Sequence, residues 1–266
     1  MTRGPDAGST RPDAGAAPRG RHTGSTRLGA IVVAWTTIDP VHLTRGHAGG
    51  QAATSASDLA ALSDADRERA GQLTPDRRAR FVAGRRLLTS LVDAEFPTAT
   101  YALRPARCAR CGRDHAGPVI DGVDAVASLA FSSGIAVAAL APTAAIDRLG
   151  VDVERDDADA TRSEDLSGLL GASGGPVLRR WTRIEAVVKA DGRGLAIDPA
   201  DVRLRGDGAR ITGDAIRYQV AGVTGPPGYW ISVAWRAPEA RAASAGTARR
   251  RTAAPGGVRS SETTAR

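Results

Sequence analysis

The sequence predicts an α+β protein made of two lobes. Its 266 residues are 42% hydrophobic and 24% charged, which is ordinary for a globular chain long enough to bury a sizeable core. The periodic segments run strand, helix, helix and then strands, helix, strands, the order expected of two successive α+β units. We therefore place an N-terminal lobe at residues 28–122 and a C-terminal lobe at residues 123–236, although no convincing sequence repeat relates them.

Two basic tails, residues 1–27 and 237–266, flank these lobes. The first has five Arg against two Asp and the second six Arg against two Glu, so together they hold the whole net charge of +7. Their low-complexity composition predicts disorder. A polyanion-binding arm around residues 249–251 is the alternative. Because a nucleic-acid-binding fold carries its basic face on the folded part, the neutral body argues against a specific nucleic-acid partner.

The N-terminal lobe is expected to begin with a strand at residues 28–38, which is rich in β-branched side chains. A helix should follow over residues 55–73, with Ser57 or Asp58 as a plausible N-cap.

A second, longer helix is expected over residues 74–96. Thr74 suits its N-cap and Pro75 its first turn. An apolar stripe at helical spacing would face the core, formed by Phe81, Leu88, Leu91 and Val92. The loop at residues 104–122 is expected to separate the two lobes.

Within this loop Cys108, Cys111 and His115 form a C-x₂-C-x₃-H pattern. Three ligands would start a zinc site, but a structural zinc site needs four and the sequence offers no evident fourth. A redox pair is a second alternative, and a loop with reduced thiols is the favoured interpretation. Two cysteines are too few for a disulfide scaffold.

The C-terminal lobe is expected to begin with strands at residues 125–131 and 134–142, followed by a short strand within residues 148–157. A polar loop at residues 156–175 then precedes a helix that contains Trp181. Strands should end the lobe, and we place them at residues 202–206, 216–222 and 229–235.

Membrane insertion and secretion are not indicated. The best apolar runs, at residues 28–35 and 134–146, are shorter than the roughly 18 residues that a membrane span needs. The opening residues have no apolar signal region. We expect a cytoplasmic monomer.

Four charged residues stand out as candidates for chemistry. Asp152 and Glu154 alternate with valines on one strand, so both carboxylates project from the same face. Glu185 and Lys189 are one helical turn apart and share a face of the Trp181 helix. A solvated strand face and a simple helical ion pair would explain each pair separately.

Lys189 is the only lysine of the chain, since the other 35 of its 36 basic residues are arginine. An ammonium is a compact point charge, a property that guanidinium does not share and that suits a phosphate-transfer site. Carboxylates from a strand and a helix can together form a cage for Mg²⁺, which prefers oxygen ligands and substrate phosphates. Such an ion would neutralise a pyrophosphate and align it for in-line attack.

These segments resemble a known signature. "LGVDVE", a spacer and "RRWTRIEAVVKADGRGL" are similar to the paired motifs of the 4′-phosphopantetheinyl transferases, of the larger two-lobed type that activates surfactin synthetase. Upstream, "RRARFVAGRRLL", "CARCGRDHAGP" and "SLAFSSG" resemble further motifs of that family in the same order. Together the similar segments cover roughly residues 70–236.

The resemblance implies two similar α+β lobes packed as a pseudo-dimer, with coenzyme A in the cleft between them. A serine hydroxyl of an acyl or peptidyl carrier protein would attack the β-phosphate of coenzyme A. The 4′-phosphopantetheine arm would move to that serine and adenosine 3′,5′-bisphosphate would leave. The carrier would serve polyketide, nonribosomal peptide or fatty acid synthesis.

The resemblance also implies roles for particular residues. Mg²⁺ would be held by Asp152, Glu154 and Glu185. Glu185, or a water on the metal, would act as general base, and Lys189 would stabilise charge on the transferring phosphoryl group. Coenzyme A would also be bound by residues of the upstream motifs, namely Arg80, Arg85 and Ser132.

Three positions depart from the family pattern. Phe131 stands in place of a histidine, Ile184 in place of a lysine, and Ala116–Gly117 in place of the usual Gly-Lys or Gly-Arg. Each change removes a polar or charged group near phosphate, and each charge-assisted hydrogen bond is worth about 1.5–3 kcal/mol. A degenerate relative that binds coenzyme A or carrier domains without catalysis is therefore the alternative function.

Overall fold

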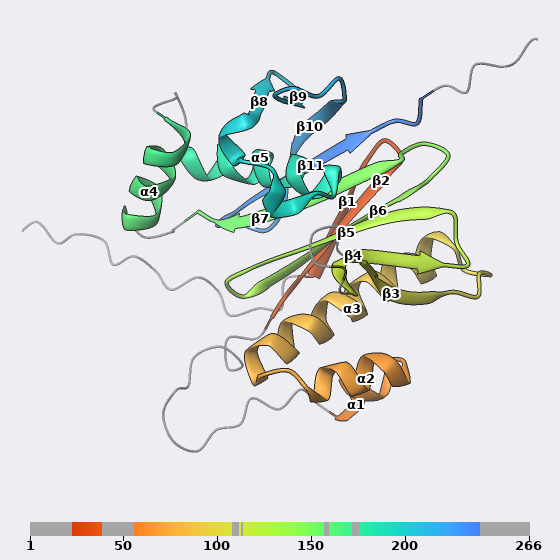
Figure 1. Cartoon of the computed structure of the whole chain (residues 1–266). Coiled ribbons are helices and arrows are strands. Elements are labelled where there is room, and N and C mark those ends of the chain that lie inside the picture. The colour runs from red at the N-terminus through yellow and green to blue at the C-terminus, as the bar shows by residue number, and fades with distance from the viewer. Residues whose placement is uncertain are drawn as a thin grey trace, which may run out of the picture.

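The computed structural model describes residues 23–38, 56–107, 112, 114–156, 160–171 and 176–239. Two antiparallel sheets, a separate two-stranded hairpin and several helices make up this part of the chain, which confirms the α+β class (Figure 1). The possible zinc ligands Cys108 and Cys111 and the side chain of His115 lie outside the described residues, as does most of each tail.

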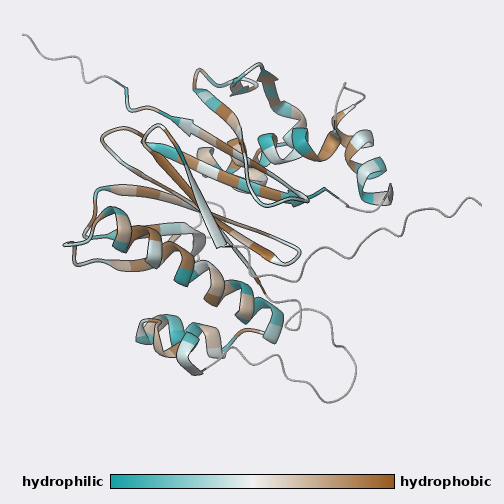
Figure 2. Cartoon of the chain, turned by 180° about the vertical axis from the view of Figure 1, so that it is seen from behind, coloured by the Kyte–Doolittle hydropathy of each residue, from teal (hydrophilic) through white to brown (hydrophobic). Residues whose placement is uncertain are grey.

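The first sheet has the strand order β1-β2-β6-β5. Its strands are β1 (Thr23–Leu28), β2 (Ile31–Thr37), β5 (Ala125–Ser132) and β6 (Ile135–Pro142). Seven of the eight residues of β6 are buried, because this strand is central and both of its faces are covered. Hydrophobic residues accordingly run along the strands, whereas the helices carry many hydrophilic residues (Figure 2).

Three helices precede the hairpin: α1 (Ala56–Ala60), α2 (Asp64–Gly71) and α3 (Pro75–Glu95). The single helix predicted for residues 55–73 is thus divided into two, because the Ser63 side chain accepts a hydrogen bond from the Asp66 amide and caps a new helix.

The helix α3 begins at Pro75, as predicted, and packs against the first sheet (Figure 1). Of its predicted apolar stripe, Leu88, Leu91 and Val92 are buried in the core, and Phe81 is half-buried. The predicted loop after α3 instead forms a hairpin, β3 (Ala102–Arg107) with β4 (Asp114–Asp121).

The second sheet has the order β7-β11-β10-β9-β8. Its strands are β7 (Arg148–Arg155), β8 (Val202–Arg205), β9 (Gly208–Ile211), β10 (Arg217–Val223) and β11 (Tyr229–Arg236). The short strand β9 was not predicted, whereas the other four lie where the sequence placed them.

The helix α5 (Val177–Asp191) packs against β7 and β11 and contains the predicted Trp181 segment. Before it, α4 (Ala160–Leu170) occupies most of the predicted polar loop, and that prediction was therefore wrong. Two short 3₁₀ helices follow α5, η2 (Gly194–Ala196) and η3 (Pro199–Asp201).

Close contact between β7 and α5 depends on Gly150. A Cβ atom at this position would lie 2.0 Å from the carbonyl oxygen of Ala186, so only glycine allows the helix to approach the strand this closely. On the opposite face of β7, Val151 and Val153 join a core shared with Val137 of the first sheet. The strand is therefore covered on both faces.

The predicted lobe boundary at residues 122 and 123 is corrected by the strand pairing. β5 and β6 pair with each other, and β6 pairs with β2, so residues up to 142 belong to the first sheet. The predicted N-terminal tail is also too long, because residues 23–27 pair with β2 through a tight turn. Both errors arise because partner strands distant in sequence cannot be read from local periodicity.

The two sheets share an order of elements. β2, α3, the β3–β4 hairpin, β5 and β6 follow one another in the first half of the chain, and β7, α5, the β8–β9 hairpin, β10 and β11 follow one another in the second. The strands then lie side by side as β2-β6-β5 and as β7-β11-β10. No helix in the described ranges is long and apolar enough to cross a membrane.

Candidate functional site

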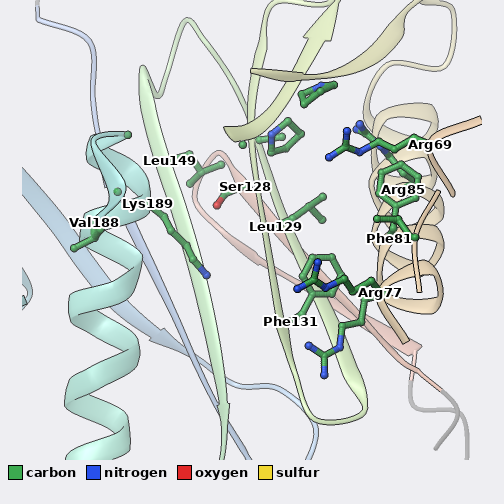
Figure 3. Close-up of a pocket in the computed structure, with 18 of the residues that line it drawn as sticks. Arg69, Arg77, Phe81, Arg85, Ser128, Leu129, Phe131, Leu149, Val188 and Lys189 are labelled. Carbon is green, nitrogen blue, oxygen red and sulfur yellow. The ribbon is translucent and has the colours of Figure 1, made fainter. Parts of the chain in front are cut away.

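A cavity of about 790 Å³ lies between α3 and α5. Its floor is formed mainly by β5, whose residues Ser128, Leu129 and Phe131 lie between Arg77 on one wall and Lys189 on the other (Figure 3). The cavity is therefore bounded by basic side chains from both halves of the chain.

The α3 wall is rich in arginine. Arg80 and Arg85, predicted to bind coenzyme A, both line the cavity, and so do Arg77 and Arg69, which the sequence analysis did not select. In a chain with 35 arginines, nothing in their local pattern distinguishes these two from surface residues. Arg69 belongs to α2 and reaches the cavity because α2 packs beside α3, whereas Arg77 lies on α3 itself.

Arg85 differs from the other arginines of this wall because its charge is already paired. Its side chain is only 6% exposed and lies 3.2 Å from a carboxylate oxygen of Asp66. Burial lowers the pKa of Arg85, and the nearby Asp66 opposes that shift. The guanidinium also lies 5.2 Å from the ring centre of Phe81, and Arg69 lies 5.9 Å from the same ring. Arg85 thus holds α2 against α3.

The floor of the cavity joins the two sheets. The buried hydroxyl of Ser128 accepts a hydrogen bond of 3.0 Å from the backbone amide of Val151. Phe131 is 37% exposed, and its ring packs so closely on Gly84 of α3 that a Cβ atom there would lie 2.6 Å from the ring. Phe131 therefore places an apolar ring in the cavity, where it also contacts α3.

Asp152 and Lys189 form an ion pair at the α5 wall. The Lys189 Nζ atom donates to Oδ1 of Asp152 at 2.6 Å, and the Asp152 side chain is 9% exposed. The second oxygen, Oδ2, is buried and has no hydrogen-bond partner among the described residues. Burial raises the pKa of Asp152 to about 6; Lys189 opposes the shift, while Glu185 and Glu154 add to it.

Glu185 and Glu154 complete the acidic neighbourhood. Burial raises the pKa of Glu185, Lys189 opposes this rise, and the charge of Glu154 adds to it. Glu154 accepts hydrogen bonds from Arg162 of α4 and, at 3.3 Å, from the hydroxyl of Ser132. The structure thus brings the four predicted charged residues into one neighbourhood.

Ser132 and Arg162 both contact Glu154, and the sequence analysis predicted neither contact. Ser132 is absent from the described lining of the cavity and instead contacts Glu154. Arg162 was missed because it lies on α4, in a segment whose polarity predicted a loop. Its ion pair with Glu154 neutralises one of the three carboxylates.

The three carboxylates are not arranged as a three-ligand metal site. Within the described ranges, no group of three or more His, Cys, Asp or Glu side chains could hold a metal ion. Asp152 and Glu154 each bind a basic side chain instead, Lys189 and Arg162 respectively. The donor set is nevertheless one of hard oxygen atoms, and the unpartnered Oδ2 of Asp152 is the kind of buried atom that a cation would satisfy.

Compared with known proteins, the chain matches no family model and, at a significant level, no curated protein.

The arrangement has a clear chemical capacity. Its arginine-rich wall can bind the negative charges of a ligand. Its opposite wall combines one ammonium with two carboxylates, Asp152 and Glu185, whose pKa values are both raised by burial. A cavity of this size suits a nucleotide-sized molecule with several anionic groups.

Proposed function

We propose that the protein transfers the 4′-phosphopantetheine arm of coenzyme A to a serine of an acyl or peptidyl carrier protein, with release of adenosine 3′,5′-bisphosphate. The observation that carries the proposal is the position of Lys189. The only ammonium side chain of the chain is paired with the buried Asp152 at the wall of a cavity whose opposite wall is rich in arginine.

The size and charge of the cavity support coenzyme A as the co-substrate. About 790 Å³ lies within the range of 300–1,000 Å³ typical of small-molecule sites. Arg77 and Arg80 would bind phosphate groups on the α3 side, where Arg85 contributes less because Asp66 already neutralises it. The apolar Leu129 and Phe131 would contact uncharged parts of the ligand.

The order of elements supports a fold of two similar lobes packed as a pseudo-dimer. Both halves place a strand, a helix, a hairpin and two further strands in the same succession, and both arrange the main strands in the same order. A cavity between α3 and α5, the corresponding helices of the two halves, fits a ligand bound between the lobes.

Each residue of the α5 wall has a role in this proposal. Lys189 would stabilise the negative charge on the transferring phosphoryl group. Glu185 would accept the proton of the carrier serine, and its raised pKa brings it closer to the neutral range in which a general base works well. Asp152 would orient Lys189 through their ion pair.

The oxygen donors of Asp152, Glu154 and Glu185, which do not form a three-ligand cluster as they stand, would have to move closer together to hold Mg²⁺ in this proposal. The fit rests on their chemistry and on the unpartnered Oδ2 of Asp152. When bound, a divalent cation neutralises charge on the pyrophosphate and on the clustered carboxylates. Glu154 would have to exchange its ion pair with Arg162 for this contact.

A second candidate function is favoured by Phe131. Its exposed ring lies in the cavity in place of a hydrogen-bond donor, which removes one contact to a phosphate oxygen. A protein with such a site can bind coenzyme A or a carrier domain without transferring the arm. In this second function the protein binds coenzyme A or the carrier domain but does not catalyse the transfer.

One experiment separates the two. The protein is incubated with coenzyme A, Mg²⁺ and an apo carrier domain, and the carrier is weighed by mass spectrometry. A transferase adds the mass of phosphopantetheine to the carrier, and the Lys189→Met variant adds it far more slowly. Binding of coenzyme A by calorimetry with no gain in carrier mass supports the second candidate, and neither binding nor mass gain contradicts both.

A further inference from the structure

Asp191, the last residue of α5, is the centre of a buried polar network outside the residues considered so far. Its carboxylate is 3% exposed and accepts hydrogen bonds from Arg193, at 2.6 and 3.1 Å, and from the hydroxyl of Tyr218, at 2.9 Å. Burial alone would raise the pKa of Asp191, but the hydrogen bonds from Arg193 and Tyr218 lower it overall. The group is therefore a fixed anion at the end of the helix.

The same residue ties α5 to the beginning of β7. The Arg148 side chain donates a hydrogen bond of 2.6 Å to the backbone carbonyl of Asp191. Further along, Lys189 meets Asp152. Later residues of the strand thus meet earlier residues of the helix, so the two elements run antiparallel. Apolar packing holds the helix on the sheet, whereas a polar network with defined partners selects one alignment along it.

The chain after Asp191 forms part of the cavity wall. Gly192 ends α5 with a φ of 88°, and Arg193 lines the cavity immediately afterwards. The guanidinium of Arg193 is bound on one side by Asp191 and on another by Asp214. This second cation of the α5 wall is therefore held in place before any ligand arrives.

We propose that Asp191 is a positioning residue for this site: its carboxylate, through Tyr218 of β10 and through Arg193, sets the position of the end of α5 on the second sheet and so places Lys189 and Arg193 in the cavity wall. The contact with Arg148 uses only the backbone carbonyl and does not depend on the side chain. The inference deepens the proposed function and rests on it only in taking the ligand of these two cations to be the phosphates of coenzyme A. Asp191 itself is outside the described cavity lining.

The single lysine makes the test direct. Lys189 and the amino terminus are the only aliphatic amines of the chain that trinitrobenzenesulfonate can modify, and peptide mass spectrometry measures their two rates separately from any reaction at the two cysteines. The amino terminus serves as the internal reference. In the wild type, the ion pair with Asp152 and a side-chain exposure of 32% protect the amine of Lys189.

We expect the Asp191→Asn substitution to accelerate modification of Lys189 about tenfold, because the loss of one charge-assisted hydrogen bond has an effect of that order. Asp214→Asn is the matched control, since it removes the outer partner of Arg193 and leaves the contacts of Asp191 with Arg148 and Tyr218 in place. Its rate should equal that of the wild type.

The inference is overturned if Lys189 is modified at the wild-type rate in Asp191→Asn while the circular dichroism of the variant is unchanged. Equal acceleration in both variants also overturns it, because the effect is then a general loss of negative charge. Should Asp191→Asn fail to fold, Tyr218→Phe decides in its place, since it removes one hydrogen bond to Asp191 and keeps the buried ring. Faster modification of Lys189 in Tyr218→Phe supports the inference, and an unchanged rate of modification overturns it.

The same assay distinguishes this inference from the proposed function. Added coenzyme A should slow modification of Lys189 in the wild type, because the ligand covers the amine. A wild-type rate that coenzyme A does not change contradicts coenzyme A as the ligand of this cavity. That result leaves the comparison between Asp191→Asn and Asp214→Asn intact.

Discussion

The two walls of the cavity differ in how they carry positive charge. The α3 wall places several arginines, among them Arg77 and Arg80, beside an apolar floor, whereas the α5 wall surrounds one lysine with carboxylates. Arginine cations on an open wall can bind a phosphate wherever it falls within reach. A lysine fixed by a buried Asp152 can act at one place only. In the proposed transferase, the α3 wall would supply affinity for the ligand and the α5 wall would supply the reaction.

The largest effect should follow from replacing Lys189. The Lys189→Met substitution should lower kcat for transfer to the carrier by about 10²–10³, the usual cost of removing one group that stabilises developing charge. Arg203, an exposed residue of β8 remote from the cavity lining, gives the matched control Arg203→Met. A mass-spectrometric time course measures both. An unchanged kcat in Lys189→Met would remove the catalytic role from the α5 wall.

The second prediction concerns pH and Asp152. Its pKa of about 6 in the folded protein lies above the ordinary value near 3.9, so the folded state binds this proton more tightly than the unfolded state does. The stabilisation is complete below pH 4 and is lost as the pH rises through 6. The difference between these two pKa values corresponds to about 3 kcal/mol of folding free energy. The Asp152→Asn variant has no carboxylate at this position, so it should not lose this stabilisation as the pH rises.

Urea unfolding between pH 4 and pH 7, with a chelator present, measures that difference. The free energy of unfolding of the wild type should fall relative to Asp152→Asn across this interval. Parallel curves for the two proteins would show that Asp152 has an ordinary pKa in the folded protein and that burial does not raise it.

The third prediction tests the close approach of α5 to β7. Gly150→Ala should lower the free energy of unfolding by about 1–3 kcal/mol, because the new methyl group must displace the backbone of the helix at Ala186. Gly222→Ala, in the same sheet, is the control, since the nearest atom to its Cβ is 4.0 Å away. Denaturant unfolding compares the two, and equal losses would mean that the approach of α5 is not limiting.

The smallest effect is expected on the α3 side. Phe131→His should lower the Kd for coenzyme A about tenfold, because it adds one hydrogen-bond donor for a phosphate oxygen. Phe131→Leu controls for the loss of the ring that packs on Gly84. Calorimetry gives both dissociation constants. If histidine and leucine give the same Kd, the position does not contact phosphate.

Local periodicity predicted the parts of the site that lie within single elements. The alternation around Asp152 and Glu154 indicated a strand, and the spacing of Glu185 and Lys189 indicated one face of a helix. Both elements form, and their charged residues come together because α5 packs on β7.

The features that the sequence did not predict depend on how separate helices and strands pack against one another. Arg69 enters the cavity lining because α2 folds beside α3, and Arg162 reaches Glu154 from a helix whose composition resembles a loop. The assignment of β5 and β6 to the first sheet depends on pairing with β2, about 100 residues earlier in the chain. No local sequence pattern identifies which strands or helices will pack together.

The apolar layer between the two sheets has a consequence for dividing the chain. Val33 and Val137 of the first sheet pack in one core with Val151 and Val233 of the second, so each half covers the other. A cut within residues 143–147 would therefore produce two fragments, each with an exposed apolar surface. We expect each fragment to precipitate when it is expressed alone. When the two are expressed together, we expect them to associate and remain in solution.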